Sequence, residues 1–425
     1  MKKLKHLQIS FLSLFAIKFF PLCLHGQQIQ VSPPTILSLT PNYVSSECTL
    51  SQSNSNILLA TVLVADPSSA SPSYHTKVWQ SQDGGQSWQD QHYPVLPQAA
   101  DPWGLLLTNS ASLIADISEG RKFHLQVSHF DLASQEWAAP KSFGYGFDHC
   151  MLLPGLDSQS VYLIATQKIK SDQQQFQTRV LIAHSRDGGR SFPKRHFHPL
   201  VKGVEFNAKQ AYLHPNGTLL VPISLRGYFF EKEESPHPFA QMQTWLYPFY
   251  DHGATLGTPS FVTKLSGRKH HWLISNSQDP ERLYFAFTDV NQQRLGLLQS
   301  HDGGSSWTAP IWIHQDSANK KSVDLSAMTI NARQEVAISW AKKVKEGCYQ
   351  RMISILFHET QQLQSHEIGQ LACPDDANGW IKTAWPQGGD YCGLIANPDD
   401  SFYLFYSYPH KGSFTPHFTQ ITFIR

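Results

Sequence analysis

Acidic residues recur near the start of short apolar segments along the whole chain. The five clearest are Glu47, Asp101, Asp148, Asp324 and Asp390, and a sixth, Glu205, stands in a looser copy. Carboxylates gathered at one place raise one another's pKa values, so they can act as acid and base, and their oxygens can hold a cation such as calcium. An acid at a turn can instead accept hydrogen bonds from backbone amides. The regular recurrence favours this structural role over ligand binding and catalysis.

The elements that must position these acids are indicated by an eight-residue pattern. Ser-x-Asp-Gly-Gly-x-Ser-aromatic occurs three times, at residues 81–88, 185–192 and 300–307. Adjacent glycines permit positive φ in a tight hairpin, Ser and Asp accept bonds from turn amides, and the aromatic gives the next strand a large group to bury. The residues with a predicted structural role are Ser81, Asp83, Gly85, Trp88, Ser185, Asp187, Gly189, Phe192, Ser300, Asp302, Gly304 and Trp307.

The spacing of the three repeats indicates how the rest of the chain is divided. Their aspartates are 104 and 115 residues apart, about twice the length of a four-stranded propeller blade. A degenerate hairpin should therefore lie between them, and residues 127–137 supply one. With many short strands, 26 Gly and 26 Pro, the chain is predicted to be all-β.

Seven four-stranded antiparallel units account for the sequence, and six remain an alternative if part of 225–265 is an insertion. The last unit supplies three strands, so the segment 29–39 is expected to close the ring with a fourth strand and remove its open edges. The units fall near 42–97, 98–144, 145–200, 201–264, 265–318, 319–370 and 380–425.

The three repeats resemble the Asp-box, or bacterial neuraminidase repeat, of the sialidase-like superfamily of secreted β-propellers. The resemblance covers about residues 42–425 and includes segments that look like the first and last blades, 46–60 and 389–394. It implies a propeller fold in which the boxes are structural hairpins on the blade rims. Fold does not imply function, so the activity must be argued from the site.

Sialidase activity in this superfamily implies three arginines around the substrate carboxylate, a tyrosine backed by a glutamate, and an acid/base aspartate. The first of these arginines belongs ahead of the first box, but the chain has no arginine before Arg121. We therefore expect a binding module without sialidase activity. The alternative is a glycoside hydrolase that uses two of the recurring carboxylates.

The candidate ligand site is the ring of recurring acids together with Tyr391, which follows Asp390. A second cluster, Tyr250-Asp251-His252, lies beside an aromatic run that begins at Trp245 and can offer stacking surfaces. No cysteine spacing resembles a zinc site, and His270-His271 is expected to be structural. We therefore predict no metal site and no cofactor, with bound calcium as a minor alternative.

The N-terminus predicts export. Lysines at positions 2, 3 and 5 precede an apolar run over 9–24, a pattern typical of a signal peptide at residues 1–26. Five cysteines then remain, and Cys348 and Cys373, which flank one strand–loop–strand segment, are the expected disulfide. The protein is predicted to be secreted, periplasmic or on the cell surface.

Charge gives no argument for a nucleic-acid or membrane partner. The net charge is +1, and charged residues make up 16% of the chain, against about 25% in average domains. The expected partner is an extracellular glycan or protein, without nucleic acid and without a membrane span in the mature chain, and the protein is expected to be a monomer.

Overall fold

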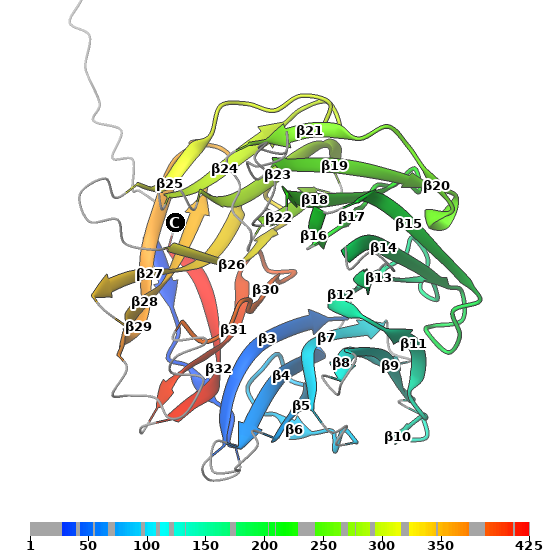
Figure 1. Ribbon diagram of the computed structural model, residues 1–425. Coiled ribbons are helices and arrows are strands. Elements are labelled where there is room, and N and C mark those ends of the chain that lie inside the picture. Colours follow the sequence, from blue (N-terminus) through cyan, green and yellow to red (C-terminus); the bar gives the residue numbers. More distant parts are fainter. Residues whose placement is uncertain are drawn as a thin grey trace, which may run out of the picture.

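The computed structural model describes residues 28–424 with gaps at 40–42, 54–55, 67–72, 95–97, 108–110, 119–122, 132, 171–175, 203, 209, 228–242, 265–270, 277, 290–293, 316–322, 346, 374–386 and 411–412. These residues form seven antiparallel sheets arranged around a central axis (Figure 1). The predicted seven-bladed β-propeller is confirmed, and the six-bladed alternative is excluded. The predicted signal peptide and His270 lie outside the described residues.

The first four blades follow one another in sequence. Blade 1 contains β3 (Val44–Gln52), β4 (Leu58–Asp66), β5 (Ser73–Ser81) and β6 (Gln89–Asp90). Blade 2 contains β7 (Ala99–Leu107), β8 (Ala111–Ser118), β9 (His124–Asp131), β10 (Glu136–Trp137) and β11 (Lys141–Tyr145). Blade 3 contains β12 (Phe147–Pro154), β13 (Val161–Lys170), β14 (Phe176–Ser185) and β15 (Lys194–Lys202). Blade 4 contains β16 (Val204–Ala208), β17 (Tyr212–Leu213), β18 (Leu219–Gly227), β19 (Gln243–Tyr250), the 3-10 turn η1 (Asp251–Gly253), β20 (Thr255–Leu256) and β21 (Ser260–Thr263).

The last three blades complete the ring. Blade 5 contains β22 (His271–Asn276), β23 (Asp279–Asp289), β24 (Arg294–Ser300) and β25 (Ile311–Gln315). Blade 6 contains β26 (Val323–Ile330), β27 (Val336–Lys345), β28 (Cys348–Leu356) and β29 (Leu363–Ala372). Blade 7 contains β30 (Gly393–Ala396), β31 (Phe402–His410), β32 (Ser413–Ile424), β1 (Gln28–Val31) and β2 (Thr35–Ile36).

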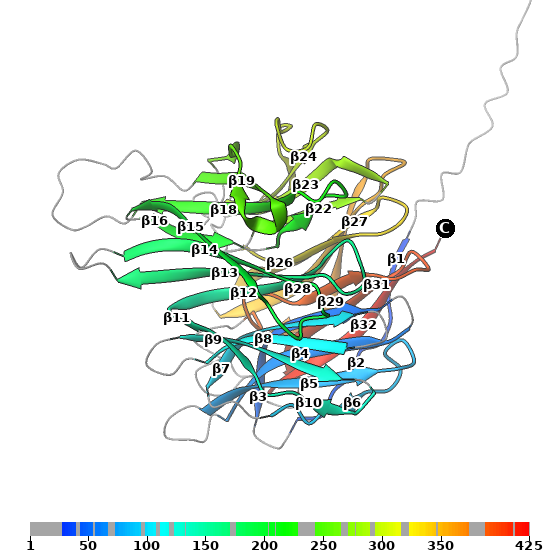
Figure 2. The ribbon, with the colours of Figure 1, turned by 90° about the vertical axis from the view of Figure 1, so that its right-hand side faces the viewer.

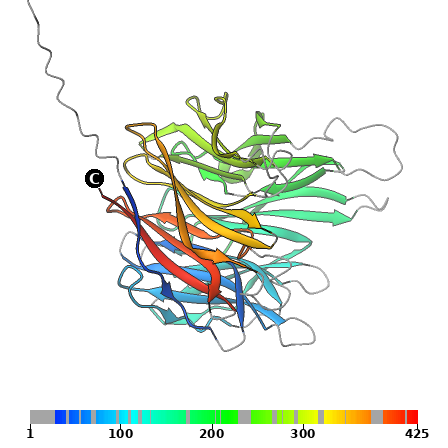
Figure 3. The same ribbon diagram turned by 90° about the vertical axis from the view of Figure 1, so that its left-hand side faces the viewer.

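The N-terminal segment closes the ring, as predicted. β1 pairs antiparallel with β32, and after a break at residues 32–34, which include two prolines, β2 pairs with the same strand. Figures 2 and 3 show β1 and β32 side by side next to the C-terminus. Proline has no amide hydrogen to donate to a sheet, so the pairing is interrupted at these residues. The interruption is tolerated because the strand lies at the outer edge of its blade.

The hydrophobic core lies between the blades. Separate clusters of buried side chains fill the spaces between blades 1 and 2, blades 2 and 3, blades 3 and 4, blades 4 and 5, and blades 7 and 1, and a larger cluster joins blades 5, 6 and 7. Each sheet therefore buries both faces, which explains why strands such as β4 are apolar almost throughout.

The described cysteines are either disulfide-bonded or free. Cys348 and Cys373 form the predicted disulfide, which joins the start of β28 to the residue after β29. Cys48, Cys150 and Cys392 are free and buried on or beside innermost strands.

The innermost strand of each blade runs from one mouth of the central channel to the other. The recurring acids lie near the strand starts, at the mouth that we call the acidic mouth. Where β3, β7 and β12 end, at the opposite mouth, a pocket of about 810 Å³ is lined by Leu50, Leu106 and Pro154 among others.

Candidate functional site

A β-bulge displaces the start of the innermost strand in the first three blades. The register shifts at Glu47 in β3, between Ala100 and Trp103 in β7, and at His149 in β12. Glu47, Asp101 and His149 all adopt positive φ, near +50°, which is uncommon for residues other than glycine. Bulges re-aim side chains and are enriched beside functional sites.

The predicted acids differ in their position relative to the β-bulges. Glu47 and Asp101 lie within their bulges, Asp148 lies one residue before the bulge of β12, and Asp324 lies two residues before the bulge of β26. Each acid was expected at the opening of its strand, but β3 already begins three residues before Glu47.

Asp101, Asp148 and His149 are brought together. One ligand atom from each lies within 4.8 Å of the other two, and all three side chains are half-buried. Lys168 Nζ lies 2.6 Å from Asp148 Oδ2, and His149 Nε2 lies 3.6 Å from Asp148 Oδ1. Two carboxylates and an imidazole suit a transition metal better than calcium, which takes six to eight oxygen ligands. Lys168 already supplies a positive charge to this group.

A small cavity adjoins the acids at this mouth. Its volume is about 20 Å³, room for about one water molecule. The lining residues come from three inner strands and two connections: Asp101, Trp103, His149, Cys150, Met151, Gln210, Trp272 and Tyr391.

Three aromatic side chains narrow the cavity. The Trp103 ring lies 6.3 Å from the ring of Trp272, in a stacked arrangement, and 6.0 Å from the ring of Tyr391. Trp103 Nε1 donates a hydrogen bond of 3.0 Å to the carbonyl of Leu152, which fixes the orientation of the indole. These contacts tie blades 2, 3, 5 and 7 together at the axis.

The side chain of Tyr391 is buried within this aromatic packing. The side chain is 7% exposed, and its hydroxyl donates to the carbonyl of Pro102 at 3.3 Å. Burial, followed by the nearby carboxylates of Glu47 and Asp101, raises the pKa of Tyr391 well above its usual value. The phenol therefore stays protonated at neutral pH.

Arg351, on β28, is a buried arginine near the axis. Its guanidinium donates to the hydroxyls of Ser326 and Ser339 at 3.2 and 3.3 Å and to the carbonyl of Gln387 at 2.7 Å. The side chain is 2% exposed, so it is not available to a ligand in solution.

Of the remaining predicted acids, Glu47, Asp324 and Asp390 have described side chains, and these do not line the cavity. Asp390 is buried, and its charge and that of Glu47 contribute to the raised pKa of Tyr391. Asp324 is half-buried on β26. Glu205 lies on β16, but its side chain is outside the described part of the chain.

The second predicted cluster divides between two surroundings. The His252 ring stacks on His184 of blade 3, with centroids 4.2 Å apart, and its Nδ1 lies 2.8 Å from the hydroxyl of Tyr162. Tyr250 instead points outward and is 43% exposed. His271 is fully buried, and its Nδ1 lies 3.0 Å from the Ser224 hydroxyl.

The three repeated turns have nearly identical internal contacts. In the first, Ser81 Oγ donates to Asp83 Oδ1 and accepts from the Gly85 amide, both at 2.8 Å, and Asp83 accepts from the amide and hydroxyl of Ser87 at 2.9 and 2.5 Å. The same four bonds recur in the second turn and in the third. The Ser and Asp side chains of each turn are thus paired within the turn itself.

Each repeated turn also packs against the preceding blade. A Cβ atom on Gly85 would lie 2.1 Å from Phe418 of blade 7, and one on Gly304 would lie 2.4 Å from Leu246 of blade 4. The Trp88 ring lies 5.2 Å from that of Phe418. Glycine permits both the positive φ and this close approach.

Several residues of the acidic mouth were not identified from the sequence. Trp103 and His149 lie inside two of the acidic segments. The neighbouring acids Asp101 and Asp148 were therefore the sequence signal that could have pointed to them. Trp272 lies in blade 5, which has no acidic opener, and only the ring geometry brings it to the axis.

The fold and site define a seven-bladed β-propeller with a narrow, partly acidic channel mouth. No family model and no curated protein matches the sequence. A solved structure of a protein of unknown function from Dyadobacter fermentans has a TM-score of 0.54 at 12% identity and covers 93% of this chain and 99% of its own. This likeness concerns the fold alone.

Other solved structures that align include sialidase propellers. The leech intramolecular trans-sialidase has a TM-score of 0.45 at 13% identity and covers 89% of this chain and 68% of its own. The Trypanosoma rangeli sialidase has a TM-score of 0.43 at 14% identity over 89% of this chain, which spans 55% of that protein. Within the described residues, no helix has the length and apolar character needed to cross a membrane.

Proposed function

We propose that this protein is an exported, monomeric β-propeller that binds a glycan or protein ligand at the acidic mouth and lacks sialidase activity. Export is supported by the basic and apolar N-terminus and by the Cys348–Cys373 disulfide, since disulfides persist in oxidising compartments. The carboxylates at this mouth can accept hydrogen bonds from the hydroxyl groups of a ligand, and aromatic rings such as that of Trp103 can contact its apolar faces. Both features suit a polar ligand with apolar faces, such as a sugar.

The observation that carries the proposal is the state of Tyr391. A tyrosine nucleophile must reach the substrate and lose its proton, but this hydroxyl is buried, bonded to Pro102 and has a raised pKa. The adjoining cavity, at about 20 Å³, is far smaller than the roughly 300 Å³ of a small-molecule site. A sugar ring can therefore rest on the mouth but not enter it.

The arginines support the same proposal. Within the described residues, Arg351 is the arginine packed beside the inner strands of blades 6 and 7, and its donors are directed to serine hydroxyls and a backbone carbonyl. Bidentate recognition of a carboxylate requires a free guanidinium edge.

A glycan array combined with a fluorogenic sialoside assay tests this function. We expect the purified mature protein to retain glycans or extracellular proteins without releasing the fluorophore. Asp101→Asn should weaken retention while the melting temperature stays close to that of the wild type. Sialoside hydrolysis by the wild type, abolished by Tyr391→Phe, would refute the proposal.

A second candidate function is a glycoside hydrolase that uses Asp101 and Asp148. Their proximity, within 4.8 Å, is close to the roughly 5–5.5 Å between the two carboxyl groups of retaining glycosidases. It requires turnover of an aryl glycoside that is lost in both Asp101→Asn and Asp148→Asn. Turnover that persists in either variant excludes this pair as the catalytic carboxylates.

A further inference from the structure

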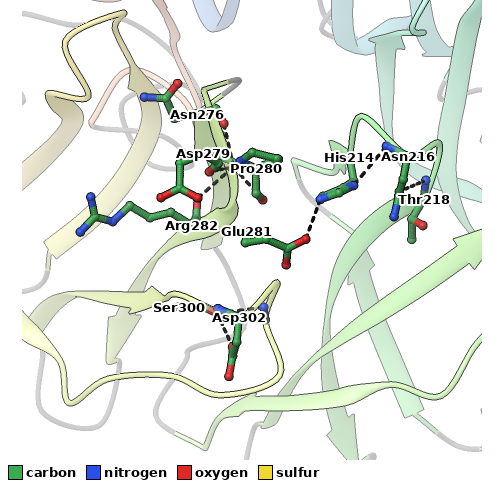
Figure 4. A network of polar contacts seen from close by, with 12 residues as sticks. His214, Asn216, Thr218, Asn276, Asp279, Pro280, Glu281, Arg282, Ser300 and Asp302 are labelled. Atoms are coloured by element: carbon green, nitrogen blue, oxygen red, sulfur yellow. Dashed lines mark hydrogen bonds and ion pairs between the residues drawn. The ribbon is translucent and has the colours of Figure 1, made fainter.

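A cleft of about 340 Å³ lies between blades 4 and 5 and shares no lining residue with the cavity at the acidic mouth. Its walls are the turn between β17 and β18, the end of β19, the start of β21 and the third repeated turn. Figure 4 shows His214 of one wall next to Glu281 of the other, with Asn216 and Thr218 on the far side of His214. The volume falls within the roughly 300–1,000 Å³ range of small-molecule sites.

One position of the repeated turn differs in side-chain size among the three copies, and in the third copy it borders the cleft. After the two glycines, the second turn carries Arg190, whose guanidinium reaches back 3.4 Å to Asp131 of the preceding blade. The first turn carries Gln86, and the third carries Ser305, which lines the cleft. The smallest of the three side chains therefore stands where the space is left unfilled.

Hydrogen bonds within the protein hold the walls of the cleft in place. Ser260 Oγ donates to the carbonyl of Gly304 at 2.7 Å, which joins the outer edge of blade 4 to the third repeated turn. On the other wall, the Thr218 amide donates to Asn216 Oδ1 at 2.9 Å. A ligand would thus meet a preorganised surface, which lowers the entropic cost of binding.

Tyr250 supplies an aromatic wall. Its ring lies over the backbone of Gly257, where a Cβ atom would be 2.5 Å from Tyr250 Cε2, yet the residue is 43% exposed. Leu256 and Phe261 nearby on the same blade are 36% and 44% exposed. An exposed aromatic ring fixed in place is suited to stacking on the apolar face of a pyranose.

The charge of the lining selects among sugars. Glu281 is 57% exposed, and its Oε1 lies 3.2 Å from His214 Nε2, while Asp302 forms part of the same wall. Among the residues that the structure describes, the lining contains these two carboxylates and neither lysine nor arginine. Carboxylates accept hydrogen bonds from hydroxyl and ammonium groups and repel another carboxylate.

We propose that this cleft is a second carbohydrate-binding site, specific for a neutral or amino pyranose and closed to acidic sugars. Tyr250 stacks on the sugar face, Glu281 accepts from its hydroxyl or ammonium groups, and Ser305 leaves the room that the ring occupies. The site is independent of the proposed function at the acidic mouth.

Saturation-transfer NMR with methyl glucoside, methyl galactoside, glucosamine and a methyl sialoside tests the proposal. We expect transfer to at least one neutral or amino sugar and none to the sialoside. Tyr250→Ala and Glu281→Gln should each weaken binding by about tenfold or more, equivalent to about 1.4 kcal/mol. Ser305→Gln, which installs a side chain closer in size to those of the other turns, should block it.

Matched controls are available elsewhere on the surface. Tyr145→Ala removes an aromatic ring that is 57% exposed on blade 2, and Glu367→Gln removes a carboxylate that is 60% exposed on blade 6. Both should leave sugar binding unchanged. Absence of transfer to every neutral and amino sugar, equal transfer to the sialoside, or binding that survives Tyr250→Ala and Glu281→Gln but is lost in Asp101→Asn would overturn the proposal.

Discussion

The repeated turns and the acidic mouth differ in how their polar groups are held. Each repeated turn closes its hydrogen bonds within eight residues, so the three copies have the same geometry although they lie in blades 1, 3 and 5. The acids near the channel depend on bulges, and the bulges fall at different distances from them. Equal sequence thus gives equal structure only where the determining contacts are local.

The contrast extends to how each region meets its neighbours. The turns contact the preceding blade mainly through a glycine backbone and an aromatic ring, which demand shape, and the second and third turns add a polar contact, through Arg190 and Gly304. The acidic mouth joins polar and aromatic groups from several blades, such as Asp101, Asp148 and Tyr391, and the carboxylates act on the titration of the phenol. The first region is sensitive to volume, and the second is sensitive to charge.

The largest expected effect comes from a methyl group at the contact between turn and blade. Gly85→Ala places Cβ against Phe418 at positive φ, so we expect a loss of about 3 kcal/mol or more in the free energy of unfolding, measured by urea denaturation. Gly84→Ala is the matched control, because φ is also positive there but Cβ would lie 3.4 Å from Tyr403 Oη. Equal losses in the two variants would show that backbone strain, not the blade contact, dominates.

A smaller effect is expected from breaking one turn internally. Ser185 is fully buried, and Ser185→Ala leaves the Gly189 amide without its 2.8 Å acceptor, which should cost about 1–3 kcal/mol. Ser134→Ala, at an exposed position of the degenerate turn in blade 2, should change stability by less than about 0.5 kcal/mol. Thermal unfolding of both variants measures the difference, and similar values would mean that the repeated turn is no more cooperative than the degenerate one.

Buried and exposed carboxylates should respond to pH with opposite signs. Burial raises the pKa of Asp116, which accepts from the hydroxyl of Tyr93 at 2.7 Å between blades 1 and 2, to about 7. The folded state then binds more protons than the unfolded state between about pH 4 and 7, so this group lowers stability as the pH rises through that window. Asp116→Asn should therefore raise the melting temperature relative to the wild type at pH 8 and not at pH 4. A difference that is the same at both pH values would rule out titration of Asp116.

The exposed aspartates of the turns give the smallest effect. Hydrogen bonds from the hydroxyl and amide of Ser87 lower the pKa of Asp83 to about 2, and Ser306 has the same effect on Asp302. Their contribution to stability is present above about pH 4 and is lost as the pH falls toward 2. In the Asp83→Asn and Asp302→Asn double variant, the fall in melting temperature over this range should be shallower than in the wild type. An unchanged slope would mean that the two carboxylates do not titrate as these bonds require.

Much of the fold could be predicted because its signals are local. The turn at 81–88 and its copies fixed the spacing of alternate blades, and the run of turn and strand signals between them predicted the remaining blades. The pairing of β1 with β32 was also predictable, because the last blade lacked one strand and an open edge is unfavourable. The disulfide followed from two cysteines at the ends of one strand–loop–strand segment.

The candidate sites were less predictable because they depend on several blades at once. No sequence signal indicates that Trp272 lies against Trp103, or that Glu281 and Tyr250 line the same cleft. His149 follows the predicted acid Asp148 directly in sequence. Its side chain reaches the cavity because of the β-bulge at this position, which the sequence does not indicate. The residue after the paired glycines looked variable in sequence, and only the packing of blades 4 and 5 shows that Ser305 leaves space there.

The sequence by itself determined the turns and the strand pattern, because hydrogen bonds and alternation within a few residues specify them, and it indicated seven blades with six as the alternative. The tertiary structure decided which acids meet, which tyrosine is buried and where the blades part to leave a cleft. Those outcomes depend on closing the ring, which brings residues hundreds of positions apart into contact, as in the bond from Tyr391 to Pro102. Short-range physics therefore sets the architecture, and the closure of the ring sets the sites.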